Sequence, residues 1–218
     1  AFGKIGACVR WHGEGELVEL KKVKIRGIPS FGMICAAEEI GLGELYPSKD
    51  EKEILDISDI LSKPGTPLSE ALGQDDVVFE VDNKSMTHRP DLWGHYGMAR
   101  EVAVMQKKKL ETYVSPKIKD GSEIKITADI EDKFLCPRYM AVAISEIEVK
   151  QSPKWLKERL VSVGIKPINN IVDITNYILY DLGQPMHAFD AKQVGHNLKI
   201  RKANQDEEFI TLDDEKHK

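Results

Sequence analysis

The sequence predicts an α+β fold in which short strands and helices occupy separate stretches of the chain. Apolar and polar residues alternate in Glu16–Ile25 and in residues 138–149, a pattern typical of strands. Between residues 164 and 190 the apolar side chains recur at helical spacing instead, on a face made of Ile171, Ile174, Ile178 and Leu182. The order strand, helix, helix, strand in the second half favours a layered α+β domain with a mixed or antiparallel sheet.

Length and composition indicate a soluble globular protein. The 218 residues suffice for two domains, and 41% of them are hydrophobic against 31% charged. No apolar run approaches the roughly 18 residues of a membrane span, and the first residues lack the apolar core of a signal peptide. Cys8, Cys35 and Cys136 are widely separated and have no CxxC spacing, which fits reduced thiols rather than disulfides or a zinc site. We therefore expect a cytoplasmic protein without a membrane partner.

The first 72 residues predict a β structure of about three strands. In Glu16–Ile25 the side chains available for a core are those of Val18, Leu20, Val23 and Ile25. Residues 30–43 then predict a strand, a short acidic helix and a glycine turn. A connector follows in residues 45–72 and ends in a short helix that stops at Gly73.

The candidate contacts to RNA phosphates are the cations Lys21, Lys22, Lys24 and Arg26. The net charge of −5 has the wrong sign for binding nucleic acid through bulk electrostatics, so any such contact must be local or shared with other subunits. A solvated strand edge, where lysines discourage sheet aggregation, is the commoner meaning of this pattern.

Residues 73–112 predict a strand over 75–81 and then a helix. Pro90 and Asp91 favour a helix start, because proline lacks a donor that would be unpaired there and aspartate complements the helix dipole. The expected buried face consists of Leu92, Met98, Ala99, Val102 and Met105. We interpret the neighbouring His88, Arg89 and His95 as helix-start and surface residues rather than catalytic ones.

The charged stretch 107–123 contains Pro116 and Gly121 and is the best linker of the chain, so the principal domain boundary is expected there. Strands are predicted over 124–130 and 138–149, and a helix over Ser152–Val163 with Ser152 as its cap. The last predicted strands lie at Leu198–Arg201 and Glu208–Leu212.

Neutral hydrogen-bonding side chains interrupt the apolar helix between residues 164 and 190. Thr175 and Asn176 lie inside it, and a buried amide or hydroxyl without a partner costs roughly 1 to 3 kcal/mol. Gly183 and Pro185 end the helix, and the turn after them presents His187 and Asp190. We expect Thr175, Asn176 and His187 to converge on one pocket.

The motifs exclude two kinds of hydrolytic centre. The sequence holds no GxSxG nucleophile turn, and His187 alone does not provide the ligand set of a metal site. A noncovalent site that orients water on a bound ester remains. On residue chemistry alone, a single histidine after Gln-Pro is more often a hydrogen-bonded structural residue.

Three runs of the sequence resemble a known family. NNIVDITNYILYDLGQPMHAFD is similar to the editing module of the bacterial phenylalanyl-tRNA synthetase β subunit, whose pattern reads INxxVDxTNYVxxExGQPxHAFD. KIRGIPSFGMICAAEEIGLG resembles the OB-fold tRNA-binding module of the same subunit, and HRPDLWGHYGMAREVA resembles its NRPD segment, with His88 in place of the usual asparagine.

This resemblance implies a partial OB-like β-barrel in residues 1–72, a connecting segment in 73–112 and the first half of an editing domain in 113–218. It implies proofreading of tyrosine wrongly attached to tRNA(Phe), with His187, Thr175 and Asn176 in the editing pocket. A polar partner for the phenolic hydroxyl lets such a pocket accept tyrosine and reject phenylalanine. The expected partners are tRNA(Phe) and an α subunit in an (αβ)2 assembly, with ATP and Mg²⁺ used only in the holoenzyme.

Two departures bear on this expectation. Lys166 stands where the family usually has arginine. Lysine keeps the positive charge but cannot make the two parallel hydrogen bonds of a guanidinium group, so we expect it to bind a substrate anion more weakly. The glutamate that binds the tyrosine hydroxyl in the family lies beyond Lys218, so the 218 residues alone are expected not to deacylate efficiently. The rival interpretations are a noncatalytic RNA-binding or scaffolding module and a freestanding aminoacyl-tRNA deacylase.

Overall fold

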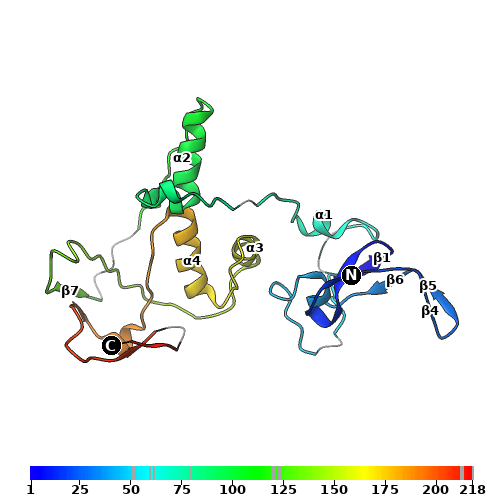
Figure 1. Cartoon of the computed structure of the whole chain (residues 1–218). Coiled ribbons are helices and arrows are strands. Elements are labelled where there is room, and N and C mark those ends of the chain that lie inside the picture. The colour runs from blue at the N-terminus through cyan, green and yellow to red at the C-terminus, as the bar shows by residue number, and fades with distance from the viewer. Residues whose placement is uncertain are drawn as a thin grey trace. The chain divides into compact units, whose positions relative to one another are not determined.

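The computed structural model describes residues 1–50, 53–58, 60, 62–78, 80–118, 121, 124–211 and 214–217. Its contacts divide the chain into two units, each built from two stretches of sequence. Unit 1 comprises Ala1–Lys108 and Lys150–Met186, and unit 2 comprises Lys109–Val149 and His187–Lys218. The regular structure of the described residues consists of helices and small two-stranded sheets, which confirms the predicted α+β class (Figure 1).

Helices α2 (His95–Met105), α3 (Lys154–Ser162) and α4 (Asn170–Leu182) form the part of unit 1 that carries Thr175 and Asn176. α4 packs beside α3, and its C-terminal end meets the start of α2 (Figure 1). The sequence predicts a core stripe on α3 made of Trp155, Leu156, Leu160 and Val163. Leu156 and Leu160 are buried, but Trp155 is 55% exposed, so this prediction is wrong in part. Gly183 ends α4 with a left-handed φ of 71°, which confirms the predicted stop.

The joint between α4 and α2 consists of backbone against backbone. A Cβ added to Gly94 would lie 2.6 Å from the carbonyl carbon of Leu182 and would also overlap the amide nitrogen of Gly183. His95 Nδ1 donates to the Tyr180 carbonyl oxygen at 2.7 Å, which satisfies an acceptor of the last helical turn. Glycine at position 94 therefore allows the two elements to approach as closely as they do.

The predicted helix start at Pro90 is a 3-10 turn rather than the first turn of α2. This turn, η4, spans Pro90–Trp93, and Gly94 is extended, so α2 begins at His95. The expected buried face is also wrong in part, because Val102 and Met105 are 39% and 73% exposed. The close approach of Gly97 to Asp91, rather than an apolar stripe, fixes how the turn lies on the helix.

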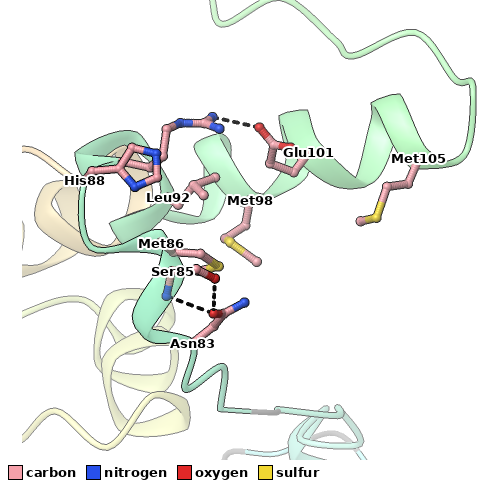
Figure 2. A pocket seen from close by; sticks show the side chains of 9 residues that line it. Asn83, Ser85, Met86, His88, Leu92, Met98, Glu101 and Met105 are labelled. Atoms are coloured by element: carbon pink, nitrogen blue, oxygen red, sulfur yellow. Dashed lines mark hydrogen bonds and ion pairs between the residues drawn. The ribbon is translucent and has the colours of Figure 1, made fainter.

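Arg89 joins η4 to α2 through a charged network. Its guanidinium donates to both carboxylate oxygens of Asp91 at 2.9 and 2.8 Å and to Glu101 at 2.7 Å. Figure 2 marks the contact with Glu101 by a dashed line. Arg100 adds a 3.3 Å ion pair with Asp91. Hydrogen bonding to Arg89 holds the pKa of the Asp91 carboxyl below its ordinary value of 3.8. These contacts give the segment a structural role, in line with our interpretation of Arg89.

The N-terminal region contains six short strands where the sequence predicted about three. They are β1 (Phe2–Lys4), β2 (Cys8–Arg10), β3 (Leu17–Glu19), β4 (Val23–Ile25), β5 (Ile28–Ser30) and β6 (Gly32–Ile34). They form three separate antiparallel pairs, β1 with β6, β2 with β3, and β4 with β5. Among the described residues these pairs do not join into a barrel, so the OB-like module remains a prediction.

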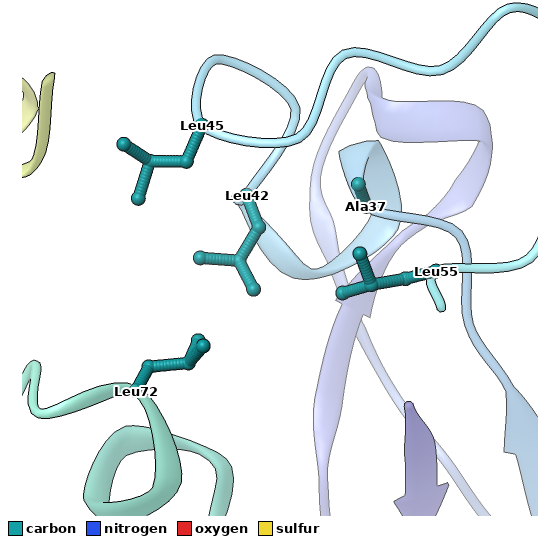
Figure 3. Close-up of a cluster of buried hydrophobic side chains, with 5 residues drawn as sticks. All are labelled: Ala37, Leu42, Leu45, Leu55 and Leu72. Atoms are coloured by element: carbon teal, nitrogen blue, oxygen red, sulfur yellow. The ribbon is translucent and has the colours of Figure 1, made fainter. Parts of the chain in front are cut away.

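A cluster of buried apolar side chains in this region gathers around the connector. Ala37, Leu42, Leu45, Leu55 and Leu72 are buried together (Figure 3). They come from the turns on either side of η2 (Glu38–Ile40), from the connector and from α1 (Leu68–Leu72). The predicted acidic helix and the helix stop at Gly73 are thus confirmed. The predicted core positions Val18, Val23 and Ile25 are instead 47%, 50% and 58% exposed.

Unit 2 contains a parallel pair of strands, β7 (Thr127–Ile130) and β8 (Asn197–Ile200). The short helix α5 (Ala191–Val194) precedes β8. The remaining short helical turns, η1 (Trp11–Gly13) and η3 (Lys84–Met86), belong to unit 1. β9 (Phe209–Ile210) pairs antiparallel with β10 (Lys216–His217). Leu212, the last residue of one predicted strand, lies outside the described residues.

Two predicted strands are wrong in the part of the chain that the structure describes. Residues 138–149 have no regular structure, and Met140, Val142 and Ile144 are each more than 70% exposed. Residues 75–78, 80 and 81 are also irregular, while Phe79 lies outside the described residues. Alternation supplies a face to bury, but a strand also needs a hydrogen-bonding neighbour. No strand among the described residues pairs with either segment.

We predict that Gly94→Ala destabilises the protein by about 1–3 kcal/mol, because the new methyl group overlaps backbone atoms that cannot rotate away. Thermal denaturation of the two proteins measures this. Gly121→Ala is the matched control, since a Cβ at Gly121 meets nothing within 4 Å. Equal melting temperatures for Gly94→Ala and Gly121→Ala would contradict the close packing of this joint.

We also predict that the Arg89–Asp91 pair makes stability depend on acid pH. A carboxyl whose folded-state pKa is lowered stabilises the fold above its unfolded pKa and loses that contribution as the pH falls through the folded value. The difference in melting temperature between the wild type and Asp91→Asn should therefore shrink below about pH 3.8. Asp75→Asn, at an exposed carboxylate, should show no such trend, and parallel curves for the wild type and Asp91→Asn would rule the linkage out.

Candidate functional site

Two asparagines start helix α4 and perform different tasks. The Asn169 side chain accepts hydrogen bonds from the amides of Ile171 and Val172, both at 3.0 Å, and so caps the helix. The next residue, Asn170, exchanges hydrogen bonds with Lys150: its side-chain oxygen accepts from the Lys150 amide at 3.0 Å and its own amide donates to the Lys150 carbonyl at 2.9 Å. The start of α4 is thereby fixed to the chain that leads into α3.

Asp173 is fully buried one turn further along α4. One carboxylate oxygen accepts a hydrogen bond from the Ser152 hydroxyl at 2.5 Å, and the other accepts a hydrogen bond from the Ile168 amide at 2.8 Å. Among the described residues no cation pairs with this carboxylate, and its position in the first turn of α4 places it at the positive end of the helix dipole. The predicted cap role of Ser152 is wrong, because its hydroxyl binds Asp173 instead of an amide of α3.

Thr175 and Asn176 follow on the half-buried surface of α4. The Thr175 hydroxyl donates to the Val172 carbonyl at 2.7 Å, so its oxygen remains able to accept a hydrogen bond but not to donate one. The Asn176 side chain makes no hydrogen bond to any described residue. An acceptor and a free amide therefore stand side by side on this helix.

His187 belongs to unit 2, whereas Thr175 and Asn176 belong to unit 1. Its exposed imidazole lies 6.3 Å from the Phe189 ring, centroid to centroid, at a tilt of 32°. Asp190 does not orient this histidine, because its carboxylate caps α5 by accepting the Lys192 amide at 2.9 Å. The convergence of His187 with Thr175 and Asn176 stays a prediction.

Lys166 lies in the loop between α3 and α4. Its ammonium group forms a 3.1 Å ion pair with Glu44, and both side chains are largely exposed, at 75% and 49%. A pair this open contributes little to stability, so the lysine can exchange Glu44 for another anion.

The candidate RNA-binding cations lie on and beside the β4–β5 hairpin. Arg26 and Gly27 form its two-residue turn with φ values of 50° and 84°, as a type I′ turn requires. The ammonium group of Lys22 lies 4.8 Å from the centre of the Phe31 ring. All four cations, Lys21, Lys22, Lys24 and Arg26, are exposed.

A cleft of about 400 Å³ opens between η3 and α2. Met86, Met98 and Met105 give it an apolar lining (Figure 2). Arg89 and Glu101 are among its polar lining residues. The sequence assigned Met98 and Met105 to a buried helix face and so missed this cleft. In the part of the chain that the structure describes, no three His, Cys, Asp or Glu side chains gather into a possible metal site, and no helix is long and apolar enough to cross a membrane.

The comparisons with known proteins divide between a domain and whole relatives. Residues 135–218 match the family model of the B3/4 domain. The chain is 41% identical over 194 residues to a phenylalanine–tRNA ligase beta subunit of Solibacter usitatus, covering 88% of this chain and 24% of the relative. The subunit of Fusobacterium nucleatum is 39% identical over 198 residues, with 89% and 24% covered, and that of Clostridium acetobutylicum is 41% identical over 208 residues, with 91% and 25% covered.

The chain thus spans about a quarter of the length of the curated relatives it matches. The B3/4 model matches the residues that contain α3, α4 and His187, and the relatives extend the likeness through most of the N-terminal region. The resemblance that the three motifs indicated is confirmed: over about nine-tenths of its length this chain is similar to phenylalanine–tRNA ligase beta subunits, at 39–41% identity.

Proposed function

We propose that this chain acts as part of the β subunit of a cytoplasmic phenylalanine–tRNA ligase and serves both phenylalanylation of tRNA(Phe) and hydrolytic editing of mischarged tyrosyl-tRNA(Phe). The observation that carries the proposal is 38–41% identity to beta subunits of this ligase over about nine-tenths of the chain. The partners would be tRNA(Phe) and the α subunit in an (αβ)2 assembly. We assign ATP and Mg²⁺ to the α subunit of the holoenzyme.

The chain would divide its work among three segments. Residues 1–72 would form an OB-like tRNA-binding module, in which the exposed cations Lys21, Lys22, Lys24 and Arg26 contact phosphates. Residues 73–112 would connect this module to the editing domain, which would begin at residue 113. The exposure of all four cations and the ring contact of Lys22 support a contact with RNA.

Editing would use neutral hydrogen-bonding groups rather than a covalent nucleophile. The Thr175 oxygen offers an acceptor for an N–H or O–H of the aminoacyl end, and the Asn176 amide offers donors for its carbonyl or for the terminal adenosine. The exposed imidazole of His187 would complete this set and help to hold the attacking water. Selectivity follows if the same site has a polar partner for the phenolic hydroxyl, which phenylalanine would leave unpaired.

The decisive experiment measures release of tyrosine from Tyr-tRNA(Phe) by the intact ligase. We expect His187→Ala and Thr175→Ala to slow deacylation by about tenfold to a hundredfold, the usual cost of losing one hydrogen bond to a transition state. Phenylalanylation by the same preparations should be unchanged, because that chemistry is assigned to the α subunit.

His196→Ala serves as the matched control, since this histidine is exposed in unit 2, which also contains His187, and we assign it no role. It should edit at the wild-type rate. If His187→Ala and Thr175→Ala also did so, the editing role would be wrong, and a noncatalytic RNA-binding or scaffolding module would remain.

Lys166 would bind an anionic group of the tRNA in place of Glu44. We predict that Lys166→Ala raises the KM for Tyr-tRNA(Phe) about two- to fivefold, the value of one exposed charge pair, and that Glu44→Gln lowers it because the competing carboxylate is gone. Lys63→Ala, at another exposed lysine of unit 1, controls for net charge. Opposite shifts for Lys166→Ala and Glu44→Gln support the assignment, and equal effects of Lys166→Ala and Lys63→Ala would refute it.

A further inference from the structure

We infer that Asp173 is a positioning residue for the editing pocket: its buried carboxylate sets the distance between the Lys166 loop and the face of α4 that presents Asn176. This inference rests on the proposed function and deepens it. It concerns only unit 1, in which all the groups involved lie.

The geometry identifies Asp173 as a tether between three segments. Its two oxygens accept the Ser152 hydroxyl, just before α3, and the Ile168 amide, in the loop that precedes α4. The carboxylate itself is an anchored part of α4, two residues from Thr175. This one side chain therefore contacts all three segments, while Asn170 separately joins the start of α4 to the chain before α3.

The tether lies next to two proposed site residues, Lys166 and Asn176. Ile168 lies two residues after Lys166, so the amide that Asp173 binds determines where that end of the loop sits. Asn176 lies three residues after Asp173 on α4, and side chains at this spacing are neighbours on one helix face. Loss of the carboxylate would free the loop to move relative to Asn176.

A direct catalytic role does not fit the site of Asp173. Its side chain is 0% exposed, and both oxygens already have donors. A group without access to solvent cannot touch an aminoacyl ester held at the surface of α4. Asp173 therefore acts by positioning other groups. Catalysis is sensitive to their position, because a displacement of about 1 Å can lower the rate about a hundredfold.

The conservative variant Asp173→Asn tests whether the hydrogen bonds at position 173 or its negative charge matter. Asparagine at 173 can still accept the Ile168 amide, and its NH₂ group can donate to Ser152, whose hydroxyl then acts as the acceptor. Asp173→Ala loses both bonds. We expect the intact ligase carrying Asp173→Asn to deacylate Tyr-tRNA(Phe) within about threefold of the wild-type kcat, and Asp173→Ala to lose about tenfold or more in kcat.

A stability-matched control excludes a general effect of a weakened helix. Asn169→Ala removes the two cap hydrogen bonds of α4 but leaves the Asp173 tether in place. It should lower the melting temperature and keep the editing kcat. Measurements at least 15 °C below the lowest melting temperature, with phenylalanylation as a second activity, keep unfolded protein out of the comparison.

Hydrogen exchange provides a readout that does not depend on editing. The Ile168 amide should exchange slowly in the wild type and in Asp173→Asn, and rapidly in Asp173→Ala. If Asp173→Ala cannot be purified, Asp173→Ser replaces it, since the short hydroxyl cannot span to Ile168 and leaves room for water beside Ser152.

The outcomes are distinct. Fast exchange at Ile168 together with a loss of editing in Asp173→Ala alone supports the inference. Wild-type editing by Asp173→Ala, or an equal loss in Asp173→Asn or Asn169→Ala, overturns it while Thr175→Ala and His187→Ala still define the site. Wild-type editing by Thr175→Ala and His187→Ala overturns the proposed function, and with it the positioning role.

Discussion

The buried carboxylate of Asp173 is the interaction on which the packing around α3 and α4 depends. A charge enclosed by protein is unfavourable unless hydrogen bonds replace its hydration, and here the Ser152 hydroxyl and the Ile168 amide do so. The requirement works in both directions. The carboxylate needs these donors, and the donors hold the approach to α3 and the loop before α4 against the helix that carries Thr175 and Asn176.

The polar residues around Asp173 fall into two groups: some make structural hydrogen bonds, and others keep the capacity to bind a ligand. Asn169 caps α4, Asn170 binds the Lys150 backbone, and Asp173 is enclosed, so all three are engaged in structure. The Thr175 oxygen and the Asn176 amide retain hydrogen-bonding capacity. A short stretch of sequence thus supplies both a rigid support and the groups that can meet a ligand, which is how precise sites are usually held.

The sequence predicted best where local chemistry decides the structure. The ends of α4 and α1 at Gly183 and Gly73 follow from glycine in the left-handed conformation, and the burial of Leu156 and Leu160 in α3 follows from their helical spacing. It failed where structure depends on a distant partner. Residues 138–149 alternate well but have no neighbouring strand among the described residues, and Glu16–Ile25 divides into β3 and β4, which pair with different strands.

The sequence indicated which residues belong to the candidate site, but not how their side chains are arranged in space. Thr175 and Asn176 were identified as polar residues in an apolar helix, but the same signal applied to Asp173, whose partners at positions 152 and 168 no helical pattern reveals. An acid at a core-facing helical position could have identified it. Placing His187 against α4 requires the relation between two units, which spacing along the chain does not encode.

The backbone joint at Gly94 and Gly183 has a consequence for how this region tolerates change. Side chains that pack through methyl groups can rotate or be exchanged for others of similar volume. Peptide groups in direct contact have no rotamers through which to adjust. The angle between α4 and the start of α2 is therefore set by backbone contact, and any side chain larger than hydrogen at Gly94 would have to change it.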